Sequence, residues 1–313
     1  MRFLRKVAPL AALLMAASLS LGACSSSDSS DQSQSSSGTP YVDRDPSGDL
    51  PAVVGNAGTE PMIDTVDAKS PENITVKLLD EGSGAEVADD DLICVEYAGF
   101  LWDDGTMFDS SYSSTDVMIF SLNRVITGWK WGLAGQHVGD RVELIVPPEY
   151  GYGDEPNGLI PAGSVLVFVV EIISAQSVDL TELGEAELTG LPLPDGIAVD
   201  GELGEQAVLA FEEGAETPTT SSETVVAEGA GQTITESDYV IYHYTGTYWG
   251  NSTGVYGTWD AGPIVVPAAD STILGHSVGT RILYVLVEGE TVQVMVVDLV
   301  GVYSGATSST DAG

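Results

Sequence analysis

The chain repeats itself at a fixed spacing. Identical residues recur 147 positions apart in the same order, and ordered matches of this kind indicate two tandem copies of one domain. We therefore expect a first domain at residues 48–176, a linker at 177–195, a second domain at 196–304 and a disordered tail at 305–313. The matches are Pro71/Pro218, Glu81/Glu228, Gly82/Gly229, Gly84/Gly231, Asp91/Asp238, Tyr97/Tyr244 and Gly99/Gly246, then, in shifted register, Asp109/Asp260, Val138/Val278, Gly139/Gly279 and Arg141/Arg281.

The first copy has the sequence pattern of a β-rich domain. Strands are predicted at Ile74–Leu79, Leu92–Trp102, Arg141–Val146 and Val165–Ile173, because these segments are rich in β-branched residues and bounded by turns. Only residues 124–135 have the pattern of a short helix. Strands and helices do not alternate, which disfavours a parallel doubly wound sheet. We predict an α+β fold in which an antiparallel sheet wraps around one short helix.

The first 24 residues have the composition of an export signal. Three cations precede an apolar stretch that is too short to span a membrane, and the stretch ends in Leu21-Gly22-Ala23-Cys24. Small residues before a cysteine resemble a bacterial lipobox, which implies a signal peptide at residues 1–23 and lipidation of Cys24. The alternative is an ordinary secretory signal. The serine-rich stretch that follows suits a flexible tether, which we place at residues 24–47.

The charge of the chain limits its partners. Ten Lys and Arg face 47 Asp and Glu, so the formal net charge is −37. Nucleic acid is excluded as a partner because phosphate binding needs clustered cations. The same charge disfavours direct adhesion to anionic lipid, so contact with the membrane would come from the lipid anchor only. Two Cys and three His make a disulfide framework or a Cys/His metal site implausible.

A series of short motifs occurs in order between residues 71 and 176. They are Val95-Glu96-Tyr97-Ala98-Gly99, Phe108-Asp109-Ser110-Ser111, Val125-Ile126-Thr127-Gly128-Trp129, Val138-Gly139-Asp140-Arg141, Pro148-Glu149-Tyr150-Gly151-Tyr152-Gly153, Leu159-Ile160-Pro161 and Leu166-Val167-Phe168-Val169-Val170-Glu171. Each motif is weak alone. Together they resemble the FKBP family, the macrolide-binding peptidyl-prolyl cis-trans isomerases. The resemblance implies an antiparallel sheet half-wrapped around a short helix, with a pocket between them.

The resemblance also implies the residues of that pocket. Trp129 would be the floor under the proline ring, the Ile126 N–H would bind a substrate carbonyl, and Tyr97 would support Asp109. The residues implied in catalysis are Tyr97, Asp109, Ile126, Trp129 and Tyr152, and those implied in substrate binding are Phe108, Met118, Val125, Leu159, Ile160 and Phe168.

These residue types suit rotation about an imide bond. The partial double bond of an imide gives a barrier of about 18–20 kcal/mol. Water stabilises the planar form through its polarised carbonyl, so an apolar pocket that removes this solvation favours the twisted state. The reaction needs no nucleophile, metal or proton shuttle, and we expect neither a cofactor nor a metal ion.

The second copy keeps the scaffold motifs and lacks the site. Aligning Asp109 with Asp260 requires four inserted residues after Gly246. Eleven residues are then lost before Val278, with the counterparts of Val125, Ile126 and Trp129. Thirteen more are lost after Arg281, with the counterparts of Tyr152, Leu159 and Ile160. We therefore expect no isomerase activity in this copy, and loss of its helix.

Three functions remain open. The first is a lipid-anchored extracytoplasmic prolyl isomerase that acts on unfolded or partly folded exported proteins with X-Pro bonds, with macrolides as further ligands. The second is a tethered binding or chaperone-like module without catalysis, which the degenerate second copy favours. The third is a hydrolase, and it depends only on Gly275-His276-Ser277-Val278-Gly279, which matches a G-x-S-x-G motif.

Overall fold

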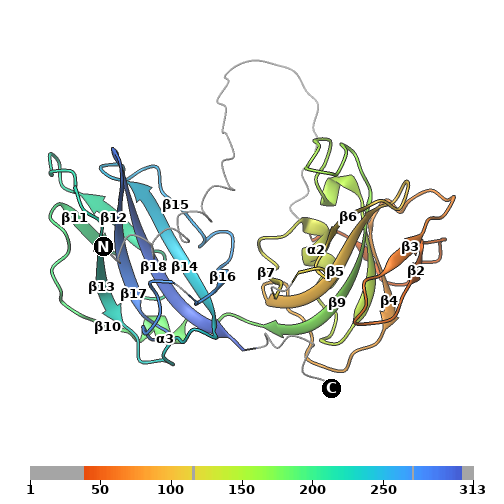
Figure 1. Cartoon of the computed structure of the whole chain (residues 1–313), viewed down its shortest axis with the longest axis horizontal. Helices are drawn as coiled ribbons and strands as arrows, with labels where there is room; N and C mark the ends of the chain where they lie inside the picture. The colour runs from red at the N-terminus through yellow and green to blue at the C-terminus, as the bar shows by residue number, and fades with distance from the viewer. Residues whose placement is uncertain (1–38, 115–116, 270, 305–313) are drawn as a thin grey trace, which may run out of the picture.

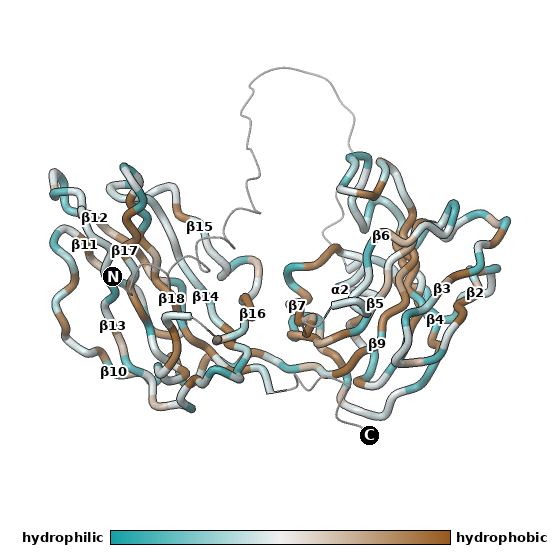
Figure 2. Tube along the Cα trace, viewed as in Figure 1, coloured by the Kyte–Doolittle hydropathy of each residue, from teal (hydrophilic) through white to brown (hydrophobic). Residues whose placement is uncertain are grey.

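Two seven-stranded sheets dominate the computed structural model of the chain (Figure 1), which describes residues 39–114, 117–269 and 271–304. The first sheet consists of β1 (Val42–Asp43), β4 (Ile74–Asp80), β5 (Leu92–Leu101), β6 (Met107–Ser110), β7 (Ile119–Ser121), β8 (Arg141–Val146) and β9 (Leu166–Gln176). The second consists of β10 (Glu187–Leu188), β13 (Ser222–Glu228), β14 (Tyr239–Tyr248), β15 (Tyr256–Gly257), β16 (Ile264–Pro267), β17 (Arg281–Glu288) and β18 (Thr291–Tyr303). Each sheet has its own buried core, and the central strands are the most apolar parts of the trace (Figure 2).

The first sheet has the order β1-β4-β8-β9-β5-β6, with β7 also paired to β5. The four strands predicted from the sequence correspond to β4, β5, β8 and β9, and the pairs that link them are antiparallel. We expected an antiparallel sheet, and one strand pair is different: β1 lies parallel to β4. Strand β1 also lies within the segment that we expected to be a flexible tether, so its residues 42–43 belong to the sheet.

The one predicted helix is present as α2 (Thr127–Leu133), and the face that packs on the sheet includes two glycines. A Cβ added at Gly128 would lie 2.4 Å from Cγ1 of Val146, and one at Gly132 would lie 2.5 Å from Cδ1 of Leu144. Two glycines therefore allow the helix backbone to approach β8 more closely than any larger residue would.

The outer face of each sheet is covered by a hairpin that the sequence did not predict. Strands β2 (Ala52–Val54) and β3 (Met62–Asp64) cover the first sheet, and β11 (Ile197–Asp200) with β12 (Val208–Phe211) covers the second. In the first repeat, Arg141 Nη1 donates to the carbonyl of Gly55 at 2.9 Å. In the second, Arg281 Nη2 donates to that of Glu205 at 2.6 Å. The arginine that the two copies share therefore anchors the covering hairpin in each.

The predicted linker is part of the second domain's structure. Residues 177–195 include the short helix α3 (Thr181–Gly184) and strand β10, which pairs antiparallel with β13. The second sheet has the order β10-β13-β17-β18-β14-β15, with β16 also paired to β14, so it follows the first sheet in every strand except the edge strand β10, which is antiparallel to its neighbour where β1 is parallel.

The alignment of Asp109 with Asp260 is wrong. The Tyr97 N–H donates to Ser111 Oγ at 2.8 Å, and the Tyr244 N–H donates to Thr258 Oγ1 at 2.9 Å. Ser111 and Thr258 are 147 residues apart, as Tyr97 and Tyr244 are, so no residue is inserted between Gly246 and Trp259. Tyr256 consequently occupies the position of Asp109, and the shared Asp was a coincidence of sequence.

The second domain loses the helix and fills its place with larger side chains. Leu122 and Ala268 are equivalent, since their N–H groups donate to the backbone carbonyls of Asp91 and Asp238. From these residues to Val138 and Val278 the second copy is six residues shorter. The described residues between β16 and β17 form turns and no helix. In this copy Tyr242 and Tyr284 stand where the first has Val95 and Leu144, and both rings are buried.

Candidate active site

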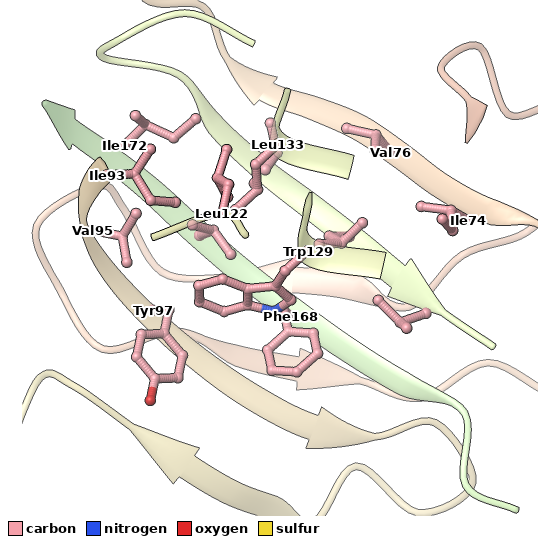
Figure 3. Close-up of a cluster of buried hydrophobic side chains, with 14 of the residues drawn as sticks. Ile74, Val76, Ile93, Val95, Tyr97, Leu122, Trp129, Leu133, Phe168 and Ile172 are labelled. Carbon is pink, nitrogen blue, oxygen red and sulfur yellow. The ribbon is translucent and has the colours of Figure 1, made fainter. Parts of the chain in front are cut away.

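Trp129 lies at the centre of an aromatic cluster in the first domain. It is in the first turn of α2, and 5% of its surface is exposed. Its ring meets Tyr97 of β5 and Phe168 of β9 edge to face, with centroids 5.2 and 5.3 Å apart, as Figure 3 shows. Phe108 of β6 extends the cluster, 5.6 Å from Phe168. Three strands and a helix thus bring together four rings of the predicted pocket.

A fifth ring was missed from the sequence. Phe120 of β7 meets both Tyr97, at 6.0 Å, and Trp129, at 5.6 Å. The resemblance placed Met118 in the site, and Met118 does pack against the same cluster. Side chains two apart on a strand share a face, so the alternation of Met118 and Phe120 was the signal that could have identified Phe120.

One carboxylate borders the rings. The Tyr97 hydroxyl donates to Asp109 Oδ2 at 2.5 Å, and β5 pairs with β6 so that Asp109 lies opposite Gly99. A Cβ at Gly99 would lie 2.5 Å from Phe108 Cζ, so glycine is required for this ring to lie over β5. Burial, reinforced by the Asp109 hydrogen bond and charge, raises the pKa of Tyr97, which keeps its hydroxyl a donor at neutral pH.

The predicted flap residues divide into two groups. Ile160 is buried and belongs to the cluster, whereas Leu159 is 76% exposed and is not brought to it. Tyr152 follows the 3-10 helix η2 (Pro148–Tyr150) and is 39% exposed. Partial burial, and then the negative charge of Asp109, raise the pKa of Tyr152.

The remaining predicted residues lie at the start of α2. Val125 and Ile126 are half-buried and pack against the cluster, and Ile126 is the N-cap of the helix. The Ile126 N–H donates to no other described residue, so it is available to an acceptor from outside the chain.

The candidate hydrolase motif has a different setting. Residues 275–279 form a turn that leads into β17, with Ser277 bridged to Thr233. A nucleophile elbow needs a turn from a strand into a helix, and this segment leads into a strand, so the hydrolase hypothesis is wrong on structural grounds.

Comparison with known proteins agrees with this geometry. The FKBP-type peptidyl-prolyl cis-trans isomerase family matches residues 84–173. A probable FK506-binding protein of Corynebacterium glutamicum is 36% identical over 116 residues, which cover 37% of this chain and 98% of that protein. The chain belongs to the FKBP-type isomerase family. The FK506-binding protein 2 of Aspergillus fumigatus is 42% identical over 95 residues, 30% of this chain and 71% of that protein.

The FKBP match lies within the first repeat, where the aromatic cluster is. Among solved structures, FkpA from Escherichia coli is 35% identical, with a TM-score of 0.32, and the match covers 35% of this chain and 51% of that one. As an FKBP-type peptidyl-prolyl cis-trans isomerase, the protein is an enzyme. Cys24 and the predicted signal peptide lie outside the described residues. No helix in the described part of the chain has the length and apolar character needed to cross a membrane.

Proposed function

We propose that the first repeat catalyses isomerisation of X-Pro bonds in unfolded or partly folded exported proteins. The observation that carries the proposal is the Trp129 indole, which meets rings from three different strands in edge-to-face contacts. A proline ring resting on the indole would be surrounded by carbon, with the Ile126 N–H free to bind the neighbouring carbonyl. This environment supports rotation about the imide, because few groups in it can replace the hydration of the planar amide.

The polar groups of the site orient the substrate and transfer no proton. Asp109 is held by the Tyr97 hydroxyl, and its charge raises the pKa of the partly exposed Tyr152. Both phenols have raised pKa values and stay neutral, so neither supplies a base at physiological pH. The role that remains for these groups is to contact the rotating amide while the rings exclude water.

We further propose that the enzyme acts outside the cytoplasm, tethered to the bacterial membrane by a lipid on Cys24. The apolar stretch that ends in Leu21-Gly22-Ala23-Cys24 and the serine-rich segment after it support this location. Proline isomerisation takes tens of seconds without a catalyst, so chains that fold after export would gain from one. Macrolides would bind the same ring-lined site and inhibit turnover.

A protease-coupled assay with a short X-Pro peptide tests the activity. We expect the full-length protein to accelerate isomerisation, and Trp129→Leu, Asp109→Ala and Tyr152→Phe each to lower kcat/KM, with the largest loss in the triple variant. Trp131→Leu is the matched control, because this indole lies on the same helix and packs against the core without meeting any of the five site rings. A wild-type protein as inactive as the triple variant would leave only the binding function.

A further inference from the structure

The second domain carries a row of tyrosines where the first has its site. Tyr242, Tyr244 and Tyr248 alternate along β14 and therefore share one face. Tyr256 of β15 fills the gap over Gly246, where a Cβ would lie 2.7 Å from its ring. Neighbouring ring centroids are 6.4, 6.3 and 6.1 Å apart in the order Tyr242, Tyr244, Tyr256, Tyr248. The four side chains form a continuous line, which we call the tyrosine row.

The tyrosine row becomes more accessible along its length. Tyr242 is 6% exposed, Tyr244 and Tyr256 are half-buried, and Tyr248 is 51% exposed. Domain stability alone does not account for a tyrosine that is half exposed next to two others. The row also stands in the register of the lost site, since Tyr256 occupies the position of Asp109. The lost carboxylate has therefore been replaced by another ring.

The tyrosine row begins beside the catalytic segment of the first domain. Arg124 directly precedes Val125 and Ile126, and its Nη1 lies 3.4 Å from the carbonyl of Gly262. Burial raises the pKa of Tyr242 and Tyr244, and the nearby positive charge of Arg124 partly opposes both shifts. Strands β15 and β16 lie on the side of the second domain that faces β7 and α2 (Figure 1). Arg124 thus links the segment that precedes Trp129 to the second domain near the buried end of the tyrosine row.

We propose that the tyrosine row binds the extended part of an unfolded, positively charged polypeptide whose X-Pro bond occupies the site at Trp129. An extended chain places alternate side chains about 6.5 Å apart on one face, which matches the spacing of the rings. Tyrosine faces accept prolyl, aromatic and cationic side chains. The net charge of −37 attracts a cationic chain, and the one cation in the sequence from 196 to 313, Arg281, is buried against Asp298.

This inference rests on the proposed function, and its test separates the two. Two substrates are compared: a four-residue X-Pro peptide, and a labelled cationic polypeptide of about 25 residues that is permanently unfolded and has one X-Pro bond. We expect wild-type kcat/KM to be higher for the long substrate. In Tyr248→Ser and in the double variant Tyr244→Ser/Tyr248→Ser, the ratio of kcat/KM for the long substrate to kcat/KM for the short one should fall at least fivefold. The cause should be a higher KM for the long substrate. Tyr41→Ser, which removes an exposed tyrosine from the first domain, should leave the ratio unchanged.

Direct binding provides a second measurement that does not depend on turnover. The fluorescence anisotropy of the long polypeptide should report binding to the wild type and a weaker complex with Tyr248→Ser, whereas a copy with its lysines replaced by glutamates should not bind. Benzoylphenylalanine in place of Tyr248 should cross-link to the bound polypeptide. Equal affinity for wild type and Tyr248→Ser, with no cross-link, would overturn the proposal. Absence of turnover with intact binding would overturn the proposed function alone.

Discussion

At the scale of single residues, the hydrogen bond between Tyr97 and Asp109 holds the polar edge of the site. Its length of 2.5 Å is typical of a hydroxyl that donates to an ionised acceptor. Tyr97 is 6% exposed while Asp109 is exposed, so the bond fixes an exposed carboxylate to a buried side chain. Its removal should therefore disturb the position of the carboxylate more than the stability of the domain.

Two substitutions at Asp109 separate charge from position. Asp109→Ala removes the acceptor and should lower kcat/KM on a short X-Pro peptide about tenfold. Asp109→Asn keeps an oxygen that accepts from Tyr97. Its loss of transition-state stabilisation should therefore be about half as large, roughly 0.7 kcal/mol. The protease-coupled assay measures both variants. Equal losses in the two would show that the negative charge alone matters, contrary to this account.

A buried carboxylate on the opposite face of the sheet makes stability depend on pH. Burial raises the pKa of Glu143 to about 7 from 4.5, and the charge of Lys77, 3.5 Å away, opposes the shift. The folded state therefore holds a proton that the unfolded chain releases between pH 4.5 and 7. Because the unfolded state binds fewer protons in this window, the contribution of Glu143 to the free energy of unfolding is largest at low pH and decreases as the pH rises.

Glu143→Gln should remove this dependence. Between pH 5 and pH 8 the free energy of unfolding of the wild type should fall by on the order of 2–3 kcal/mol more than that of the variant. Urea unfolding at several pH values measures the difference, and every other titrating group cancels between the two proteins. Parallel pH profiles would show that Glu143 ionises normally in the folded state.

Sequence reasoning identified most of the individual site residues and missed the ones that depend on packing. Trp129, Phe168, Tyr97 and Asp109 lie within ordered motifs, and the structure brings them together. Phe120 lies outside every motif, because its place in the cluster comes from the pairing of β7 with β5. Leu159 belongs to a motif yet faces solvent. Side-chain direction in a loop depends on tertiary contacts that one sequence does not show.

At the scale of elements, the hairpins are the parts that the sequence concealed. Strands β2 and β3 have three residues each and follow a serine-rich tract, so their apolar pattern is too short to detect. Their positions depend on a distant ion pair. Arg141 lies 3.2 Å from Glu171, and the Gly58 N–H donates to Glu171 at 2.8 Å. In the second sheet Arg281 and Asp298 form an ion pair at the same register. This shared role explains why both copies have an arginine at this position.

Two neighbouring residues of β3 test what the first hairpin covers. Ile63 is half-buried against the outer face of the sheet, whereas the side chain of Met62 is 63% exposed. Ile63→Ala should lower the free energy of unfolding by about 1–2 kcal/mol, and Met62→Ala by less than about 0.5 kcal/mol. Chemical denaturation of the full-length protein measures both. Equal effects would mean that the hairpin does not seal this face.

At the scale of the whole molecule, the two domains are joined by equivalent positions. One apolar cluster contains Cys94 and Ile119 from the first repeat and Ile241 and Val265 from the second, which occupy the same registers. A bulge between β5 and β9 and its counterpart between β14 and β18 add Ile173 and Val300. Ser174 Oγ and Tyr303 Oη lie 2.9 Å apart across the contact. The apolar part of this contact is pseudo-symmetric, as in an isologous dimer interface, whereas the contact between Ser174 and Tyr303 has no reciprocal counterpart, because Gly301 stands in the position of Ser174.

The sequence showed that there were two copies but not that they would pack together. The interface residues are apolar β-strand positions, which in a single sequence look like those of any sheet core. The pattern of apolar residues is the same for a strand end that packs against its own domain and for one that packs against another domain. The bulges allow the two domains to pack together, because they turn Ile173 and Val300 away from the cores of their own domains. A bulge depends on pairing, which local sequence does not determine.

A charge placed in this interface should separate the domains without unfolding them. Val300 is 4% exposed and belongs to the interface cluster, so Val300→Asp would bury an unpaired carboxylate unless the domains part. Cys94 reports the change, because burial raises the pKa of its thiol to about 11 and keeps it unreactive at pH 8. We expect thiol reagents to modify Cys94 at least tenfold faster in Val300→Asp, as followed by mass spectrometry of the Cys94 peptide. We also expect the thermal transition to split in two. Val208→Asp, at an exposed position of β12, should match the wild type in both measurements. A protected Cys94 and a single transition in Val300→Asp would show that this contact does not hold the two domains together.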